Sequence, residues 1–314
     1  MNKQLLAAAA IASIAFAGLA FAAPALAVDC ANGTLYVNTQ TELIQYNEAG
    51  TQVGSPVTFQ NGVGYGDIAI SQDLTTVYGV FNENGWDNPN VPDGLANGNL
   101  IEVIDAATGT VTSSFLITGA AAGVGGWVGA AMLPSGELVI GSGNDPKVYK
   151  VNVTTGASTE WVDLSVADPS ITYNMGDFAR LPDGDEIAIG DNGGGVNATL
   201  VRIHEDGSMT VAGTIPNAWG AGRVGNTIMV SGDAMHSIKI SDIPASGTSE
   251  IPSVQLNAFS DAWGAAGSQD ATVEACDPAA LANTGLNAGA LGALALGLGF
   301  AGAAGVVIAR RKNA

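Results

Sequence analysis

The chain has 314 residues, of which 29 are acidic and 10 are basic, and its formal net charge is −19. Lys3 and residues 310–312 supply four of the ten cations, whereas every acid lies between Asp29 and Asp277. Residues 28–284 therefore carry 6 cations against 29 acids, a formal net charge of −23. Such a charge repels nucleic acid and anionic membranes, and it excludes a nucleic-acid-binding protein. It favours solubility outside the cell, with binding of cationic partners as the alternative.

The N-terminal residues have the pattern of a secretory signal peptide. Lys3 is the only charged residue before Asp29, and an apolar run over residues 5–22 follows it. Ala25 and Ala27 are small residues at the two positions that signal peptidase reads, so residues 1–27 are predicted to be removed. An uncleaved N-terminal membrane helix is the alternative.

Two cysteines, Cys30 and Cys276, lie near the two ends of the predicted ectodomain, residues 28–276. In an oxidising compartment a pair placed in this way is expected to form a disulfide, which would close a loop of about 245 residues. Two free thiols are the alternative. Neither cysteine has the spacing of a zinc site.

The middle of the chain is predicted to be all-β, because short apolar alternations are broken by turn residues. One stretch recurs five times, with an aromatic residue or Met followed by Gly and small residues: "GYGDIAI" (64–70), "GWVGAAM" (126–132), "NMGDFAR" (174–180), "AWGAGRV" (218–224) and "AWGAAGS" (262–268). The gaps between the anchor residues are 62, 48, 44 and 44 residues. The first gap is long because of the insertion "NENGWDNPNVPDGLANGN".

A turn and an apolar strand follow each of these stretches, and most continue into a third and a fourth strand. A period of about 45 residues with four strands per unit is the signature of a β-propeller blade. The segment "VIDAATGTV" (103–111) resembles the third strand, turn and fourth strand of the YVTN-type and quinoprotein-like propellers. That resemblance implies the fold alone, because propellers have many functions.

The chain is expected to begin inside a blade. "GTLYVNT", "ELIQYNE" and "SPVTF" have the pattern of second, third and fourth strands, and no first strand precedes them. "AWGAAGS" would supply the missing first strand, so that a shared blade closes the ring and brings Cys30 and Cys276 together. This arrangement predicts five blades. Reading "TVEAC" (272–276) as a further second strand would give a sixth, partial blade.

Asp67 and Asp177 are the weak catalytic candidates of the sequence. They occupy one position in two innermost strands, where the other repeats have small residues (Gly129, Ala221 and Ala265). Paired carboxyl groups in a propeller channel can act as acid and base or hold a cation, as in five-bladed glycosidases. Asp191 and Asp233 also hold equivalent positions, after two second strands. Solvated or turn-capping roles are the competing interpretation, because the domain has so many acids.

The aromatic anchors Tyr65, Trp127, Trp219 and Trp263 are the candidates for ligand binding. They would form a stacking ring for sugars at the channel mouth, or else wedge between blades as core residues. The two histidines, His204 and His236, lie in different repeats without a partner ligand.

The insertion contains "DNPNVPDG" (87–94), in which Asp87, Asn90 and Asp93 are weak calcium candidates. The stretch lacks the spacing and the closing Glu of an EF-hand, so the alternative is a polar surface loop. No other cofactor is predicted. Because the insertion extends one blade on one face, it is also a candidate recognition loop.

After a linker of four residues, the chain closes with the motif Leu281-Ala282-Asn283-Thr284-Gly285, a charge-free run over 286–309 and the basic tail 310–314. As a helix, the run would span about 36 Å, enough for a bilayer core of about 30 Å. The basic tail would remain in the cytoplasm.

This tripartite end resembles the sorting signal of Gram-positive cell-wall proteins. The resemblance implies that a sortase thiolate attacks the carbonyl of Thr284, cuts before Gly285 and transfers Thr284 to a peptidoglycan amine. Ala282 replaces the usual Pro, a variant associated with actinobacteria. A simple C-terminal membrane anchor is the alternative.

The sequence therefore predicts a secreted propeller, transiently membrane-inserted and then covalently held in the cell wall. A non-enzymatic module that binds an unknown surface ligand or glycan is favoured. An extracellular hydrolase or lyase using Asp67 and Asp177 is the first alternative, and a structural wall protein is the second. With only residues 277–280 as a stalk, contacts with the wall or close neighbours are expected.

Overall fold

The structure is a computed structural model that describes residues 33–60, 62, 64–82, 98–191, 197–258 and 262–271. Several predictions made from the sequence lie outside these residues: the signal peptide, the Cys30–Cys276 disulfide, the calcium candidates, the possible strand 272–276, the sorting motif and the apolar run 286–309. Within the described residues, no helix has the length and apolar character needed to cross a membrane.

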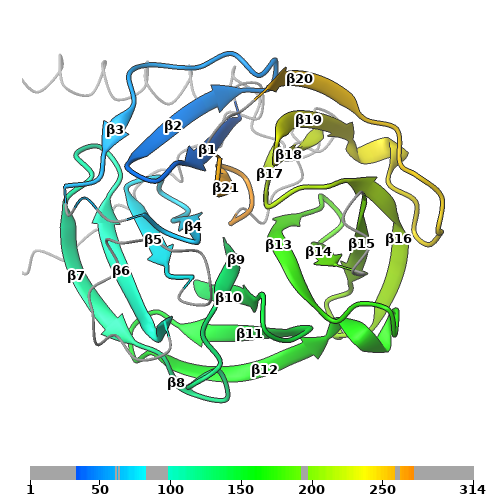
Figure 1. Cartoon of the computed structure of the whole chain (residues 1–314), viewed down its shortest axis with the longest axis horizontal. Coiled ribbons are helices and arrows are strands. Elements are labelled where there is room, and N and C mark those ends of the chain that lie inside the picture. The colour runs from blue at the N-terminus through cyan, green and yellow to red at the C-terminus, as the bar shows by residue number, and fades with distance from the viewer. Residues whose placement is uncertain are drawn as a thin grey trace, which may run out of the picture.

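Five β-sheets surround one axis (Figure 1), so the predicted five-bladed propeller is confirmed for the described residues. Blade 1 combines β21 (Gly264–Gly267), β1 (Thr34–Asn38), β2 (Glu42–Asn47) and β3 (Val57–Thr58). Blade 2 consists of β4 (Asp67–Ile70), β5 (Thr76–Val80), β6 (Leu100–Asp105) and β7 (Val111–Leu116). Blade 3 consists of β9 (Trp127–Met132), β10 (Glu137–Ser142), β11 (Lys147–Asn152) and β12 (Ala157–Asp163), with β8 (Thr118–Gly119) parallel to its outer edge.

Blade 4 consists of β13 (Tyr173–Arg180), β14 (Glu186–Asp191), β15 (Asn197–Ile203) and β16 (Met209–Pro216). Blade 5 consists of β17 (Gly220–Val224), β18 (Thr227–Ser231), β19 (Ala234–Lys239) and β20 (Val254–Ala258). Two short 3-10 helices, η2 (Leu164–Val166) and η3 (Ile240–Asp242), follow β12 and β19. The five recurring stretches of the sequence are the innermost strands β4, β9, β13, β17 and β21.

The shared blade is also confirmed. β21 pairs antiparallel with β1, with Leu35 opposite Gly267 and Asn38 opposite Gly264. The strand from the C-terminal part of the propeller is thus the inner strand of the blade that begins the chain, and the ring is closed by backbone hydrogen bonds.

The hydrophobic core lies between neighbouring blades. One cluster joins Ile101 of blade 2 to Trp127 and Ile140 of blade 3, and another joins Ile189 of blade 4 to Ile228 of blade 5. Each sheet therefore buries both faces, and inner and second strands are almost continuously buried. Sheets buried on both faces have near-continuous apolar strands rather than a polar–apolar alternation.

Glycine lets the innermost strands approach backbone to backbone at the axis. A Cβ atom added to Gly176 would lie 2.6 Å from the carbonyl oxygen of Trp219, and one added to Gly220 would lie 2.6 Å from the amide nitrogen of Ala265. No side chain fits in such a space, because the neighbouring atoms belong to backbone. This close packing explains why the recurring stretches consist of small residues.

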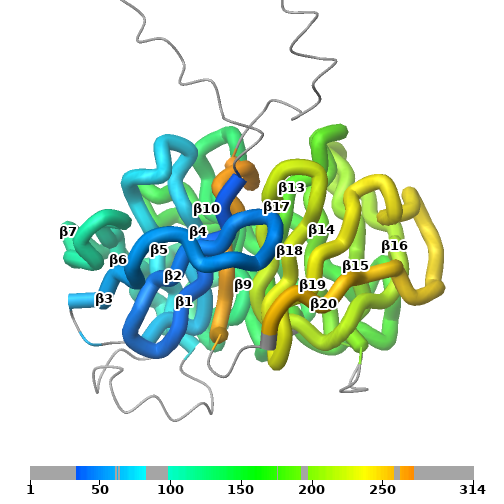
Figure 2. The backbone as a smooth tube through the Cα atoms, turned by 90° about the horizontal axis from the view of Figure 1, so that it is seen from above, coloured from blue at the N-terminus to red at the C-terminus, as the bar shows by residue number. Residues whose placement is uncertain are grey.

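The propeller has two faces, which we name by the inner strands. At the terminal face the inner strands end, and the two ends of the described chain lie side by side there (Figure 2). Thr34 and Ser268 exchange hydrogen bonds of 2.9 and 2.8 Å at this point. At the opposite loop face, the inner strands begin, at residues 64–66, 126, 172, 217–219 and 262–263, and the second strands end.

Candidate functional site

Asp67, on the inner strand β4, is completely buried in the axis. Its Oδ1 accepts a hydrogen bond of 2.7 Å from the amide of Ile68, and its Oδ2 accepts one of 2.9 Å from the amide of Ala130 on β9. The amide of Ala265 on β21 is a third donor. One carboxyl group thus connects β4 to the inner strands on both sides.

Asp177, on the inner strand β13, makes the matching contacts on the other side of the ring. Its Oδ1 accepts hydrogen bonds from the amides of Phe178 (2.7 Å) and Ala130 (3.2 Å), and its Oδ2 accepts one from Ala221 on β17 (3.1 Å). Asp177 is also completely buried. Together these two residues, which we call the axial pair, connect all five inner strands.

The axial pair satisfies amide groups that have no strand partner. The inner edge of each blade faces the axis, where its N–H groups cannot reach water, and unpaired buried N–H groups destabilise a fold. Carboxyl oxygens are strong acceptors for such donors. The small residues at the equivalent positions of the other three strands leave room for the two carboxyl groups.

Burial raises the pKa of Asp67 well above the usual range of an aspartate, although the three amide donors act in the opposite direction. Burial also raises the pKa of Asp177, and the charge of Asp67 raises it further. With no exposed surface and with backbone donors on their oxygens, neither group can reach a substrate in this structure. The two catalytic candidates therefore lie where they connect the inner strands, and not where they could contact a substrate.

A second buried cluster lies at the terminal face, and it was missed by sequence reasoning. Asp270, in the turn after β21, accepts hydrogen bonds from the amides of Gly267 (2.6 Å), Arg223 (2.9 Å) and Arg180 (3.3 Å). Burial raises the pKa of Asp270 to about 7. The turns 71–73 and 268–270 both read "SQD", but Asp73 is exposed, so the local sequence gives no signal of the difference.

Two arginines and a glutamate complete the terminal-face cluster. Arg180 forms a 2.5 Å ion pair with Glu186, whose side chain is 5% exposed. Burial raises the pKa of Glu186 to about 8, against the opposing effect of Arg180. Arg223 is 1% exposed, and its Nη2 has no hydrogen-bond partner within the described structure.

The structure separates the four aromatic candidates into two pairs. Tyr65 is completely buried between blades 1 and 2, and Trp127 is completely buried between blades 2 and 3. The hydroxyl of Tyr65 donates to Glu102 (2.5 Å), and the indole N–H of Trp127 donates to the carbonyl of Gly98 (2.8 Å). These two residues are core wedges, and no face of either ring is open to a ligand.

Trp219 and Trp263 are half-buried and lie at the loop face, immediately before β17 and β21. Because β17 and β21 are neighbouring inner strands, the two residues start adjacent positions around the axis. Each is fixed by its backbone: the amide of Trp219 donates to Ser231 (2.8 Å), and that of Trp263 donates to Asn38 (3.0 Å). They are the aromatic candidates that keep some exposed surface.

Polar residues end the second strands at the same face. Asn38, Ser142, Asp191 and Ser231 are all buried. Asp191 ends β14 and bonds to the hydroxyl of Tyr173, whereas Asp233 is exposed in the turn after β18, so the two aspartates that the sequence predicts to be equivalent have different environments. Within the described structure, the Oδ1 of Asn38 and the Oγ of Ser231 have no hydrogen-bond partner.

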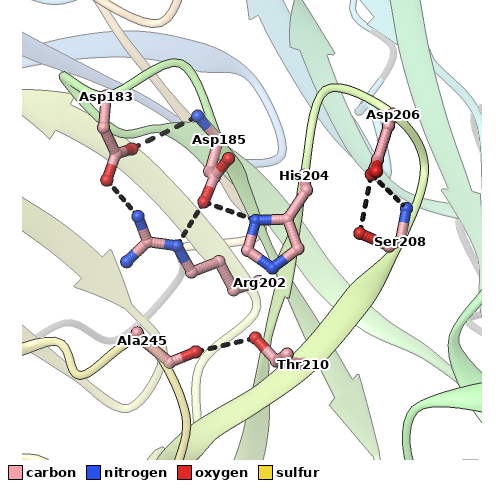
Figure 3. A network of polar contacts seen from close by, with 8 residues as sticks. All are labelled: Asp183, Asp185, Arg202, His204, Asp206, Ser208, Thr210 and Ala245. Carbon is pink, nitrogen blue, oxygen red and sulfur yellow. Dashed lines mark hydrogen bonds and ion pairs between the residues drawn. The ribbon is translucent and has the colours of Figure 1, made fainter.

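The two histidines lie apart, in blades 4 and 5. His204 Nδ1 is 2.8 Å from Asp185 Oδ2, and Arg202 bridges Asp185 to Asp183 in a surface network (Figure 3). Burial lowers the pKa of His236, which is 3.5 Å from the hydroxyl of Ser253. The described residues contain no group of three or more acidic, histidine or cysteine side chains able to hold a metal ion.

The chain matches no protein-family model and no curated protein. It is similar in structure to virginiamycin B lyase from Staphylococcus aureus, with 15% identity, a TM-score of 0.38, and coverage of 69% of this chain and 63% of that one. This chain therefore spans less than two thirds of the length of that lyase.

Two further solved structures are similar at the same level. An auxiliary nutrient binding protein from Bacteroides thetaiotaomicron has 11% identity, a TM-score of 0.41, and coverage of 66% of this chain and 52% of that one. A streptogramin B lyase has 11% identity, a TM-score of 0.39, and coverage of 73% and 74%. At these values, the similarities carry no argument about function.

Proposed function

We propose that this chain is an exported, wall-anchored propeller that binds a ligand at its loop face without catalysing a reaction in its axis. The observation that carries the non-enzymatic part is the burial of the axial pair. Among the described inner strands, Asp67 and Asp177 are the only matched carboxyl groups, and their oxygens already accept hydrogen bonds from backbone amides. Acid–base catalysis needs a group within hydrogen-bond reach of the substrate, and this position provides no such access.

Support for wall anchoring comes from the sequence alone. The motif at 281–285, the apolar run at 286–309 and the basic tail occur in the order that sorting requires. On this proposal, sortase acts transiently and Thr284 ends in an amide to peptidoglycan. The described chain ends at Ala271 on the terminal face, so the propeller would be held from that face with its loop face turned outward.

The loop face supports a glycan as the ligand class. Trp219 and Trp263 lie before neighbouring inner strands and keep partly exposed side chains. Aromatic rings pack against the apolar faces of sugars, and amide and hydroxyl groups hydrogen-bond their hydroxyls. Asn217 precedes Trp219 and is partly exposed, so a polar group of the required kind lies beside the rings.

Two experiments test this function. Mass spectrometry of cell-wall fragments should find Thr284 joined to a peptidoglycan amine, and a retained 286–309 segment would contradict sorting. A glycan array probed with the full chain should give binding that Trp219→Ala and Trp263→Ala reduce at least tenfold. Trp161→Ala is the matched control, because Trp161 lies on the outer strand β12 against Lys150.

The outcomes separate the alternatives. Binding that is unchanged by both loop-face substitutions would show that the binding site lies elsewhere. The absence of glycan binding on the array would favour a structural wall protein. Turnover of a glycan that is abolished by Asp67→Asn and Asp177→Asn in a folded protein would establish the hydrolase or lyase alternative instead.

A further inference from the structure

The axial pair brings two acidic side chains into contact inside a closed axis. Asp67 Oδ2 and Asp177 Oδ1 accept the same amide N–H, that of Ala130, at 2.9 and 3.2 Å, so the two carboxyl groups are close neighbours. Two ionised carboxylates have only acceptor atoms and cannot bond to each other, whereas a pair that holds one proton can. Two bare negative charges at this separation, without water, would repel each other strongly.

Within the part of the chain that the structure describes, the groups around the pair do not supply a compensating positive charge. The packed elements present the amides of Ala130 from β9, Ala221 from β17 and Ala265 from β21, and the third carboxyl group, that of Asp270, adds negative charge. The basic side chains nearest to Asp270, Arg180 and Arg223, interact with Glu186 and Asp270 at the terminal face. The axis is therefore a place where a proton, rather than a cation of the chain, balances the charge.

We infer that the axial pair is a proton clasp: in the folded propeller the two carboxyl groups share one retained proton, and loss of that proton loosens the ring of inner strands. Asp177 holds the proton and Asp67 is the carboxylate. Each carboxyl group accepts the amide of the next residue at 2.7 Å, so the difference lies in the bonds from other strands. The Ala130 amide is 2.9 Å from Asp67, whereas the bonds from Ala221 and Ala130 to Asp177 are longer, at 3.1 and 3.2 Å. Short amide bonds stabilise the charged form.

The clasp gives the direction of a pH effect. In the unfolded chain, an aspartate has a pKa of about 3.9. Burial raises the pKa of both axial groups in the folded chain, so the folded state keeps a proton that the unfolded state has lost. Stability from this source is complete below about pH 4 and falls as the pH rises toward the folded pKa. Between the unfolded and the folded pKa, each retained proton makes the folding equilibrium constant fall about tenfold for every pH unit by which the pH rises.

The experiment measures urea unfolding of the full chain at a series of pH values from about 4 to about 9. Asp270 and Glu186, with folded pKa values of about 7 and about 8, also keep protons in part of this range, so the wild type is compared with variants that retain both groups. Above about pH 4, the folding equilibrium constant of the wild type should fall more steeply with pH than that of the axial variants, by up to about tenfold per pH unit. Asp177→Asn and Asp67→Asn should each flatten that fall, because neither variant keeps a shared proton.

Asp73→Asn is the matched control, since Asp73 is exposed in the turn after β4 and should leave the wild-type slope unchanged. A flat wild-type profile, or equal slopes in the wild type and both axial variants, would overturn the clasp. Should the axial variants fail to fold, infrared spectroscopy of the wild type over the same pH range decides the question. A carbonyl band of a protonated carboxylic acid beyond those of Asp270 and Glu186 supports the clasp, and the absence of such a band overturns it.

Discussion

Aspartates at the rim and in the axis of this propeller accept the same kind of hydrogen bond from backbone amides, but their pKa values shift in opposite directions. At the rim, Asp206 accepts hydrogen bonds from the amide (2.9 Å) and hydroxyl (2.6 Å) of Ser208, and these bonds lower its pKa (Figure 3). In the axis, Asp67 accepts comparable amide bonds, yet burial raises its pKa. Hydrogen bonds decide the charge state where water remains, and loss of water decides it where none remains.

This contrast has consequences for stability. Replacing an exposed carboxylate in a turn should change the free energy of unfolding little, because water can accept the hydrogen bonds of its donors. A buried carboxyl group that satisfies amides from three strands cannot be replaced in that way, because removing it leaves the amides unpaired. The substitutions below test the contrast, from the largest expected effect to the smallest.

Asp67→Ala should have the largest effect. It removes the carboxyl acceptor of the Ile68 and Ala265 amides in the closed axis, and it leaves the Ala130 amide with only its longer bond to Asp177. An unpaired buried donor costs about 1–3 kcal/mol, so we expect the free energy of unfolding to fall by about 2–5 kcal/mol in urea titrations at neutral pH. Asp206→Ala at the rim should change it far less, and equal losses at the two sites would contradict the contrast.

Gly176→Ala should come next. The added Cβ would lie 2.6 Å from the carbonyl oxygen of Trp219 and 3.1 Å from that of Ala218, and both are backbone atoms that cannot rotate away. Overpacking of this kind typically costs about 1–3 kcal/mol. Thermal unfolding should show the loss.

Gly143→Ala is the matched control for this substitution. Its added Cβ would have ordinary contacts, the nearest at 3.6 Å to Val128, so its stability should stay within about 0.5 kcal/mol of the wild type. A wild-type melting temperature for Gly176→Ala would show that the inner strands can separate without a penalty.

The fold was predictable because it repeats. Each inner strand carries its anchor residue and small residues, so the five stretches were found by their spacing, and the missing first strand before Thr34 indicated the shared blade. Close packing at the axis requires small residues in every repeat. This requirement produces a recurring pattern that can be recognised in the sequence.

The candidate site was only partly predictable. Asp67 and Asp177 were correctly selected as a pair, but a sequence does not reveal whether a carboxyl group meets water or backbone. Asp270 was missed because its "SQD" turn is identical to that of Asp73, and only the packing of β21 against β17 and β13 distinguishes them. Likewise, Tyr65 and Trp127 share the anchor pattern of Trp219 and Trp263, although only the first two are fully buried.

Asp270→Asn should change the pH dependence of stability by a moderate amount. The folded pKa of about 7 exceeds the unfolded value of about 3.9, so the folded state retains a proton between these values. Stability from Asp270 is therefore complete below about pH 4 and is lost by about pH 7. The variant should remove up to about 1.4 kcal/mol per pH unit from the slope in this window. Unfolding measured from pH 4 to 7 checks this, and an unchanged slope would show that Asp270 is ionised in the folded protein.

Asp206→Asn should have the smallest effect, and its sign should be opposite. The folded pKa of Asp206 is lowered, so its contribution is present above the unfolded pKa and is lost as the pH falls through the folded value. An asparagine Oδ1 still accepts the hydrogen bonds from Ser208, so the turn should be kept. Unfolding curves of variant and wild type should therefore run parallel above about pH 5 and diverge only below it. A divergence at alkaline pH would place Asp206 in the same class as the axial pair, and the contrast between rim and axis would then fail.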